Sequence, residues 1–177
     1  MTKIEEILQL QVKPKEKQIK LIEAIVSGEI PVSEFITFFE SAADVDKGTC
    51  ADVLKHVSAK SPELLASYID VLVKYINYKA PRVKWGIPEA IGNLAKKYPA
   101  QTAIAIPYLL KNTTDDKANT TVIKWCAAFA LTEIAKSHPD SRKQLLPIFE
   151  KISRAEKNNG VKNVYVKALK AIEQHKI

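Results

Sequence analysis

Two stretches, VKWGIPEAIGNL at residues 83–94 and IKWCAAFALTEI at residues 123–134, decide the fold. Each contains a Lys-Trp pair followed by small and aliphatic residues. In the first stretch the apolar residues lie at i, i+4, i+7, i+8 and i+11, namely Val83, Ile87, Ala90, Ile91 and Leu94. This spacing predicts an amphipathic helix with one apolar stripe. The second stretch predicts the same helix forty residues later.

The two stretches belong to a repeat that runs through most of the chain. A shift of 37 residues upstream takes Lys84 to Lys47, and a shift of 38 downstream takes Lys124 to Lys162. Four copies result, and stacked copies of this length form one continuous core. The sequence therefore predicts a single repeat domain over residues 1–177, with repeats at 31–60, 62–97, 99–137 and 139–177 behind an N-terminal capping helix pair at 1–28.

Prolines mark the first helix of each copy. A proline suits a helix entry because its missing N–H costs nothing there, and Pro31, Pro62, Pro99 and Pro139 stand at such entries. Pro107 and Pro147 lie farther along and are expected to kink their helices. The pattern predicts ten helices in five antiparallel pairs, at residues 2–11, 14–27, 31–43, 46–60, 62–77, 81–97, 100–112, 119–137, 140–156 and 160–176.

The repeat resembles the HEAT family of helical repeats. The resemblance rests on the two stretches quoted above, on the similar segment at 161–172, and on the prolines Pro107 and Pro147 in first helices. The segment at 46–60 departs from the pattern, since no aliphatic residue precedes Lys47. The resemblance implies an all-α fold, a right-handed α-α superhelix of the HEAT and armadillo-like kind with about five helix pairs. It also implies a scaffold that many unrelated partners use.

Composition and residue spacing argue against catalysis. With only 5 Gly the chain offers no glycine-rich phosphate loop. The three histidines, His56, His138 and His175, lie in different copies at unrelated helix positions. Cys50 and Cys126 have no further Cys or His at ligand spacing, and we expect buried, inert thiols. The sequence thus predicts a protein that is not an enzyme, with no metal, no cofactor and no small-molecule substrate.

The two cysteines and the apolar runs also bear on location. Two widely separated cysteines make no disulfide framework, which indicates a reducing compartment. No run of about 20 apolar residues is present to cross a membrane, and the N-terminus lacks a signal-like apolar core. We therefore expect a cytoplasmic protein with no membrane partner.

Positive charge gathers in the C-terminal half. Residues 1–80 carry 10 Lys+Arg against 12 Asp+Glu, whereas residues 81–177 carry 17 against 8, a net charge of +9. Most of the excess falls on the second helices, which line the concave side in HEAT-like repeats. A basic surface attracts acidic partners. The predicted partner-binding residues on this face are Lys84, Trp85, Glu89, Lys96, Lys124, Trp125, Phe129, Lys136, Lys162 and Lys167.

The tryptophans and lysines of this predicted site can also have a purely structural role. The tryptophans can pack between neighbouring repeats instead of contacting a partner. Lys84, Lys124 and Lys162 lie in first helical turns, where the helix dipole disfavours a cation. Ion pairs can offset that cost, and Asp115 or Asp116 is well placed for Lys124.

The sequence leads to two function hypotheses. The first is a scaffold or adaptor that binds a protein with an acidic segment or an amphipathic helix through a basic, Trp-containing concave face. The alternative is nucleic-acid binding through the same lysines, as in helical-repeat proteins similar to the DNA alkylation repeat family. The chain lacks the paired-arginine tryptophan segments expected of that family, and a glycosylase-like enzyme ranks last for the same reason.

Overall fold

The computed structural model describes residues 1–175 and contains only helices in that range. The last two positions, which the predicted final repeat includes, lie outside the described residues. Five helical segments are the first members of successive pairs: α1 (Lys3–Gln9), α3 (Val32–Ser41), the 3₁₀ helix η1 (Pro62–Tyr68) with α5 (Ile69–Lys74), α7 (Pro99–Ala103) with α8 (Ile106–Leu110), and α10 (Pro139–Ala155). The second members are α2 (Pro14–Val26), α4 (Asp44–Lys60), α6 (Pro81–Ala95), α9 (Thr121–Ser137) and α11 (Asn159–His175).

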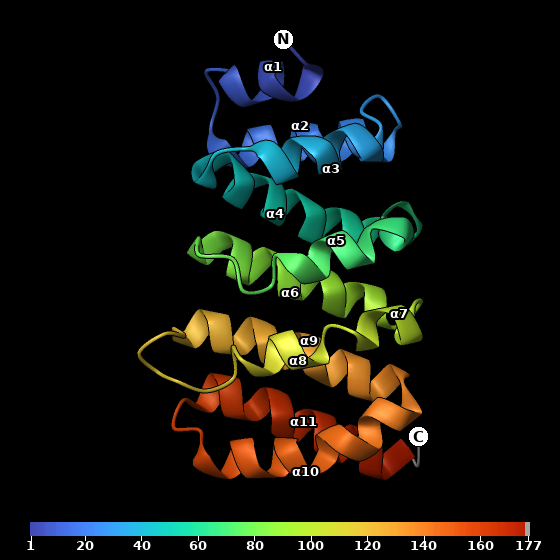
Figure 1. Cartoon of the computed structure of the whole chain (residues 1–177), viewed down its shortest axis with the longest axis vertical. Helices are drawn as coiled ribbons and strands as arrows, with labels where there is room; N and C mark the ends of the chain where they lie inside the picture. The colour runs from blue at the N-terminus through green and yellow to red at the C-terminus, as the bar shows by residue number, and fades with distance from the viewer. Residues whose placement is uncertain (176–177) are drawn as a thin grey trace.

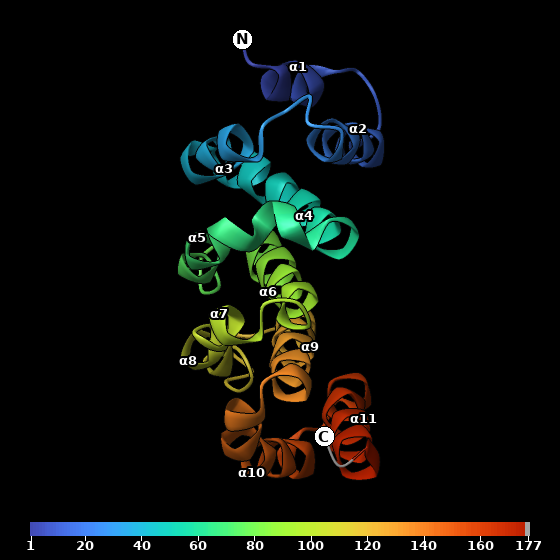
Figure 2. The ribbon, with the colours of Figure 1, turned by 90° about the vertical axis from the view of Figure 1, so that its right-hand side faces the viewer.

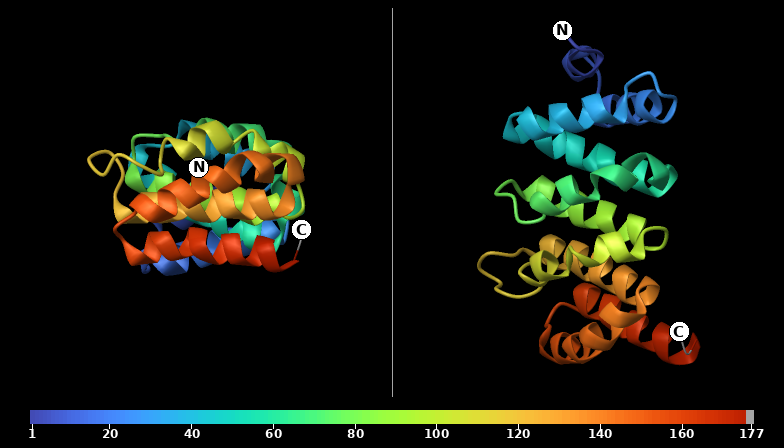
Figure 3. Two further views of the ribbon diagram at one scale, coloured as in Figure 1. Left: turned by 90° about the horizontal axis from the view of Figure 1, so that it is seen from below. Right: turned by 45° about the vertical axis from the view of Figure 1, so that its right-hand side comes forward.

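The pairs are stacked along one long axis, with the two termini at opposite ends (Figure 1). The second helices form one row, and the first helices from α3 to α10 form another row beside it (Figure 2). The row of second helices is curved. Its two ends, α2 and α11, lie farther from the row of first helices than α6 and α9 do (Figure 2). Seen along the stack, the loop between α8 and α9 projects beyond the helix ends (Figure 3).

Two of the expected first helices are broken. The segment predicted as one helix at 62–77 begins as the 3₁₀ helix η1 and continues as α5, which ends at Lys74. The segment predicted at 100–112 divides into α7 and α8, and Pro107 lies in the first turn of α8. Because proline cannot donate a hydrogen bond to the preceding turn, it favours a fresh helix start at this point. Pro147, in contrast, lies inside α10, which continues from Pro139 to Ala155.

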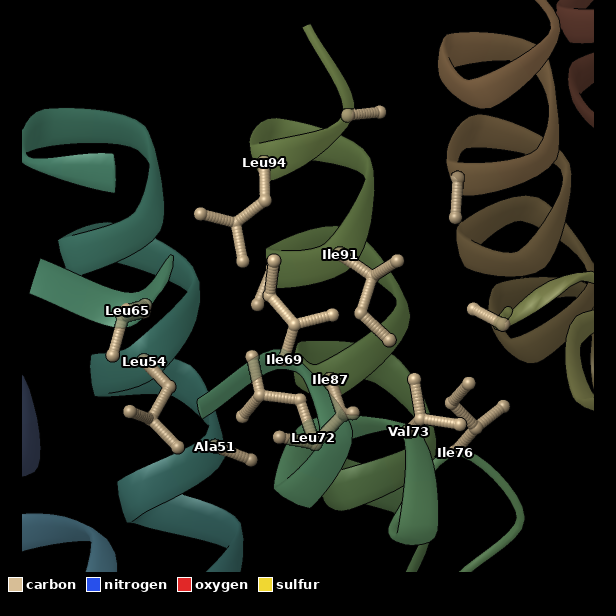
Figure 4. Packing of buried hydrophobic residues seen from close by; sticks show 14 of the residues in the cluster. Ala51, Leu54, Leu65, Ile69, Leu72, Val73, Ile76, Ile87, Ile91 and Leu94 are labelled. Carbon is tan, nitrogen blue, oxygen red and sulfur yellow. The ribbon is translucent and has the colours of Figure 1, made fainter. Parts of the chain in front are cut away.

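The core fills the space between the two rows. Ile69 and Leu72 of α5 lie against Leu54 of α4 and Ile87 of α6, and all four side chains are at most 2% exposed (Figure 4). Side chains from three helices therefore meet in one layer, and similar layers recur along the stack. Burial of such aliphatic side chains stabilises a fold by about 1.5–3 kcal/mol each.

The middle of the second-helix row is its tightest part. A Cβ atom on Gly86 of α6 would lie 2.6 Å from the backbone oxygen of Ala51 on α4. On the same helix, a Cβ on Gly92 would lie 2.7 Å from the Phe129 ring of α9. Only glycine permits both approaches, because any side chain there would overlap a neighbouring helix. Gly86 and Gly92 thus let α6 pack closely between α4 and α9.

Lys47, the residue that departs from the aliphatic-basic pattern, joins two helices of one pair. Its Nζ donates hydrogen bonds to the backbone oxygens of Phe39, at 2.5 Å, and Glu40, at 2.7 Å, near the end of α3. The same ammonium lies 5.1–5.4 Å from the ring centroids of Phe39, Tyr75 and Tyr78. Burial lowers the pKa of Lys47, and the bound carbonyl oxygens satisfy its donors.

Candidate partner-binding surface

A groove opens between α9 and α11 near the C-terminal end of the second-helix row. We call it the C-terminal groove; its volume is about 420 Å³, and it is lined by Trp125, Phe129 and Thr132 of α9 and by Gly160, Val164, Ala168 and Ala171 of α11, with Glu133, Lys136, Asn163 and Lys167 at its edges. Trp125 is 38% exposed. Its ring lies parallel to that of Phe129, with the centroids 5.8 Å apart. The groove thus has one aromatic wall and one wall of small residues.

Of the residues on the α11 side of this groove, Lys167 was predicted as a site residue, whereas the small and aliphatic residues were not. Gly160, Val164, Ala168 and Ala171 follow one another at i, i+4, i+8 and i+11, which places them on one face of the helix. That spacing was readable from the sequence. Which helix this face opposes was not, because the partner wall lies on α9, more than thirty residues upstream.

The charges at the edges of the C-terminal groove differ in their pairing. Lys136 makes an ion pair with Glu133 one turn away on α9. Lys162 and Lys167 of α11 make no ion pair within the described part of the chain. Lys167 is exposed and Lys162 is partly exposed. Lys167 therefore places one uncompensated ammonium group on the α11 side of the groove, whereas Lys162 does not line it.

Farther up the same row, the polar groups pair with one another between helices. Arg82 of α6 donates to the Asp52 carboxylate of α4 at 2.5 Å. About two turns later on α6, Glu89 lies 3.7 Å from Lys55 of α4 and accepts a hydrogen bond from the Cys126 thiol of α9. Glu89, a predicted contact residue, is thus held by two neighbouring helices. In this part of the row the charges largely satisfy each other.

Lys124 is a correction to the predicted site. Its side chain is 7% exposed and its Nζ lies 2.8 Å from both Asp116 and Glu156. The sequence anticipated the pairing with Asp116 but not the one with Glu156. Burial alone would lower the pKa of Lys124, but the hydrogen bonds that its ammonium donates to the two carboxylates outweigh burial and raise the pKa. Lys124 is therefore a buried clamp between the loop before α9 and the end of α10, and its ammonium is already paired with two carboxylates.

Glu156 is the less exposed carboxylate of this clamp. Its side chain is 6% exposed, against 79% for Asp116. Burial by itself would raise the pKa of Glu156, but hydrogen bonds from Lys124 and from the Asn158 backbone N–H lower it overall. The carboxylate is therefore ionised when the clamp is closed.

Of the three remaining predicted residues, Lys84 and Trp85 lie on α6 and Lys96 follows its last residue. Trp85 is only partly exposed, and its indole N–H is buried with no hydrogen-bond acceptor in the described structure. Lys84 is partly exposed and Lys96 fully exposed, and neither makes an ion pair with a described residue. The two tryptophans, equivalent in the repeat, thus differ: Trp125 faces an open groove, whereas Trp85 lies on the closely packed helix.

The two cysteines are buried, as the sequence analysis expected, and the three histidines lie apart from one another. His56 and His175 are exposed, and His138 accepts a hydrogen bond from the Ser141 backbone N–H at the start of α10. Burial raises the pKa of Cys50 to about 12 and also raises that of Cys126. Among residues 1–175 no three His, Cys, Asp or Glu side chains are grouped as a metal site.

None of the helices described over residues 1–175 combines the length and the apolar character needed to cross a lipid bilayer. Comparisons of the chain with protein-family models, with curated proteins and with solved structures give no match.

Proposed function

We propose that the chain is a non-enzymatic, HEAT-like helical-repeat scaffold, coiled as a right-handed superhelix, that binds a protein partner through its second-helix row. The observation that carries this proposal is the C-terminal groove, with an exposed Trp125 stacked on Phe129 opposite the small residues of α11. Large exposed aromatic side chains beside an apolar groove are the usual anchors of protein interfaces.

The form of the groove favours a helical or extended protein segment. Two parallel helices bound it, and Gly160 and Ala168 leave room for side chains inserted from outside. An amphipathic helix lays apolar residues spaced by three or four into such a groove. The uncompensated Lys167 selects acidic residues on the flank of that helix, because opposite charges steer association and exclude basic competitors.

Nucleic-acid binding through the same face is the second candidate. Lys96, Lys162 and Lys167 make no ion pair with described residues and are able to reach phosphates. However, Arg82 and Lys136 are paired with carboxylates and Lys124 is buried. Few phosphate contacts remain, so the groove supports a protein segment better than a phosphate backbone.

The experiment uses the fluorescence of Trp125. Replacing Trp85 by Phe leaves Trp125 as the single tryptophan, since the chain has 2 Trp. The probe is a synthetic amphipathic peptide of about 16 residues with Leu at helical spacing and Glu elsewhere. Two further probes are a peptide of equal charge with Gln in place of Leu, and a single-stranded oligothymidylate of about 20 nucleotides.

We expect the Leu/Glu peptide to bind and to shift the Trp125 emission to shorter wavelength, because the ring becomes buried. Trp125→Ala should weaken this binding by at least about 30-fold, as measured by calorimetry, which corresponds to about 2 kcal/mol at an interface anchor. The matched control is Tyr108→Ala in α8, since Tyr108 is 42% exposed but lies in the first-helix row.

Three results decide between the candidates. Equal binding by the Leu and Gln peptides would contradict the apolar groove. Equal loss from Trp125→Ala and Tyr108→Ala would contradict Trp125 as an anchor. Tight binding of the oligothymidylate with a steep dependence on salt, and none of the peptide, would replace the protein partner by nucleic acid.

A further inference from the structure

A second groove lies on the same row, between α2 and α4. We call it the N-terminal groove; its volume is about 490 Å³, and the residues that matter here are Ile19 and Ile22 of α2, His56 and Ala59 of α4, and Lys15 and Lys60 at the edges. Ile19 is 43% exposed, and Ala59 is also exposed. An isoleucine so exposed on the flank of a groove offers apolar surface that nothing within the chain covers.

The repeat places the two grooves on the same face. The successive shifts of 37 and 40 residues carry His56 and Ala59 of α4 to Glu133 and Lys136 of α9. Both positions lie at the edge of a groove, His56 and Ala59 toward α2, Glu133 and Lys136 toward α11. The second helices form one row (Figure 2), so a single ligand running along that row meets both grooves.

We infer that the N-terminal groove takes a second apolar anchor of the same acidic protein segment that occupies the C-terminal groove. This inference rests on the proposed function. The occupant is argued from charge: Lys15 and Lys60 flank the N-terminal groove without an ion pair to any described residue, against one carboxylate, Glu23. Both grooves thus combine apolar walls with uncompensated ammonium groups, and the same ligand chemistry satisfies both.

The region between the grooves explains why the anchors are separate. There Asp52 pairs with Arg82, and Glu89 with Lys55, so the surface is already satisfied and has little to offer an apolar side chain. Neighbouring packed helices lie about 8–10 Å apart, and three such steps separate the grooves. The two anchors should therefore be about 25–30 Å apart.

A connected pair of anchors gains affinity through effective concentration. Once one anchor is seated, a flexible linker of about 20 residues has an r.m.s. end-to-end distance of about 25 Å and holds the second anchor near its groove. A linker of 4 residues extends at most about 14 Å and does not reach. A linker of about 60 residues reaches but dilutes the second anchor.

The test compares synthetic peptides that differ only in linker length. One carries a single Leu/Glu anchor, and three carry two such anchors joined by uncharged Gly/Ser linkers of about 4, 20 and 60 residues. Affinities are measured by calorimetry against the full chain. We expect the 20-residue linker to give at least a tenfold gain over the single anchor, the 4-residue linker no more than the twofold statistical gain, and the 60-residue linker an intermediate gain.

Substitutions locate the second anchor. Ile19→Glu and Lys60→Glu should each remove the gain while leaving the affinity of the single-anchor peptide unchanged. The matched control is Ile104→Glu, since Ile104 is 45% exposed but lies between α7 and α8, in the first-helix row. Circular dichroism confirms that each variant is folded.

The outcomes separate this inference from the proposed function. A 20-residue peptide that binds no more tightly than the single anchor, or a gain that survives Ile19→Glu, overturns the second anchor and leaves the C-terminal groove intact. A single-anchor peptide that does not bind, or that binds Trp125→Ala equally well, overturns the proposed function itself.

Discussion

The middle and the ends of the second-helix row are built differently. In the middle, α6 packs closely against α4 and α9 through Gly86 and Gly92, and its Arg82 and Glu89 side chains form ion pairs with α4. At the two ends, α2 and α11 leave grooves flanked by the exposed side chains Ile19 and Trp125. The same repeat thus gives a closely packed centre and a groove at each end. The residues where two helices cross determine whether those helices pack closely or leave a groove.

The contrast at α9 shows how the open end is held. On its α6 side, α9 makes direct van der Waals contact over Gly92. Toward the C-terminal pair, the Lys124 clamp ties the start of α9 to the Asp116 loop and to Glu156 at the end of α10. Close packing therefore holds the middle, whereas a buried ion-pair clamp contributes to holding the C-terminal end.

The largest effect should come from filling the tight crossing. Gly86→Ala places a methyl group against the Ala51 backbone, and we expect a loss of about 3 kcal/mol in the free energy of unfolding. For a chain of this length that loss lowers Tm by about 6–12 °C, measured by thermal denaturation. Gly160→Ala is the control, because a Cβ there meets no backbone atom within 4 Å. Equal Tm values for both variants would contradict the tight middle.

Removing the clamp should cost less. Lys124→Met leaves Glu156 buried without its cation, and we expect a loss of about 2 kcal/mol in urea denaturation, since one of the two carboxylates is well exposed. The double variant Lys124→Met with Glu156→Leu should recover part of that loss, because no buried charge then remains unpaired. A double variant less stable than Lys124→Met would contradict the clamp.

The clamp also predicts a dependence on pH. The pKa of Glu156 is lowered on folding from its ordinary 4.5, so its contribution is complete well above that value and disappears as pH falls through the folded pKa. Glu156→Gln should therefore be less stable than the natural chain at pH 7, by about 1 kcal/mol, and this difference should be smaller near pH 3. Glu150→Gln, at an exposed ion pair, should show no such change. The measurement is urea denaturation at both pH values.

The smallest effects should come from the open ends. Ile19→Ala removes an aliphatic side chain that is 43% exposed and should change the free energy of unfolding by no more than about 0.5 kcal/mol. Ile87→Ala, at a fully buried position of α6, should cost at least about 2 kcal/mol in the same assay. Comparable losses in the free energy of unfolding at the two positions would contradict the difference in packing between the ends and the middle of the row.

Local patterns in the sequence were sufficient for much of the fold. The apolar spacing in 83–94 and 123–134 predicted α6 and α9, and the prolines predicted the starts of η1, α7 and α10. The break between α7 and α8 was expected only as a kink at Pro107. The 3₁₀ form of η1 was not anticipated, because its apolar residues follow the same spacing as an ordinary helix.

The candidate site was less predictable. Trp85 and Trp125 occupy equivalent positions in the repeat, so no pattern within their own helices distinguishes them. Their difference depends on how closely the next helix packs, and that depends on residues that face each other between helices, such as Phe129 of α9 against Gly92 of α6 and Ala168 of α11 across the groove from Trp125. Lys124 shows the same limit, since its nearby partner Asp116 was anticipated and its distant partner Glu156 was not.

The sequence by itself determined the helical class, the repeat period and the basic C-terminal half, because these depend on residue spacing and composition. Only the tertiary structure decided which side chains are accessible, which charges are paired, and where the row opens into grooves. These properties depend on contacts between helices thirty or more residues apart. A helix has the same apolar face wherever it packs, but the neighbouring helices determine whether that face is buried.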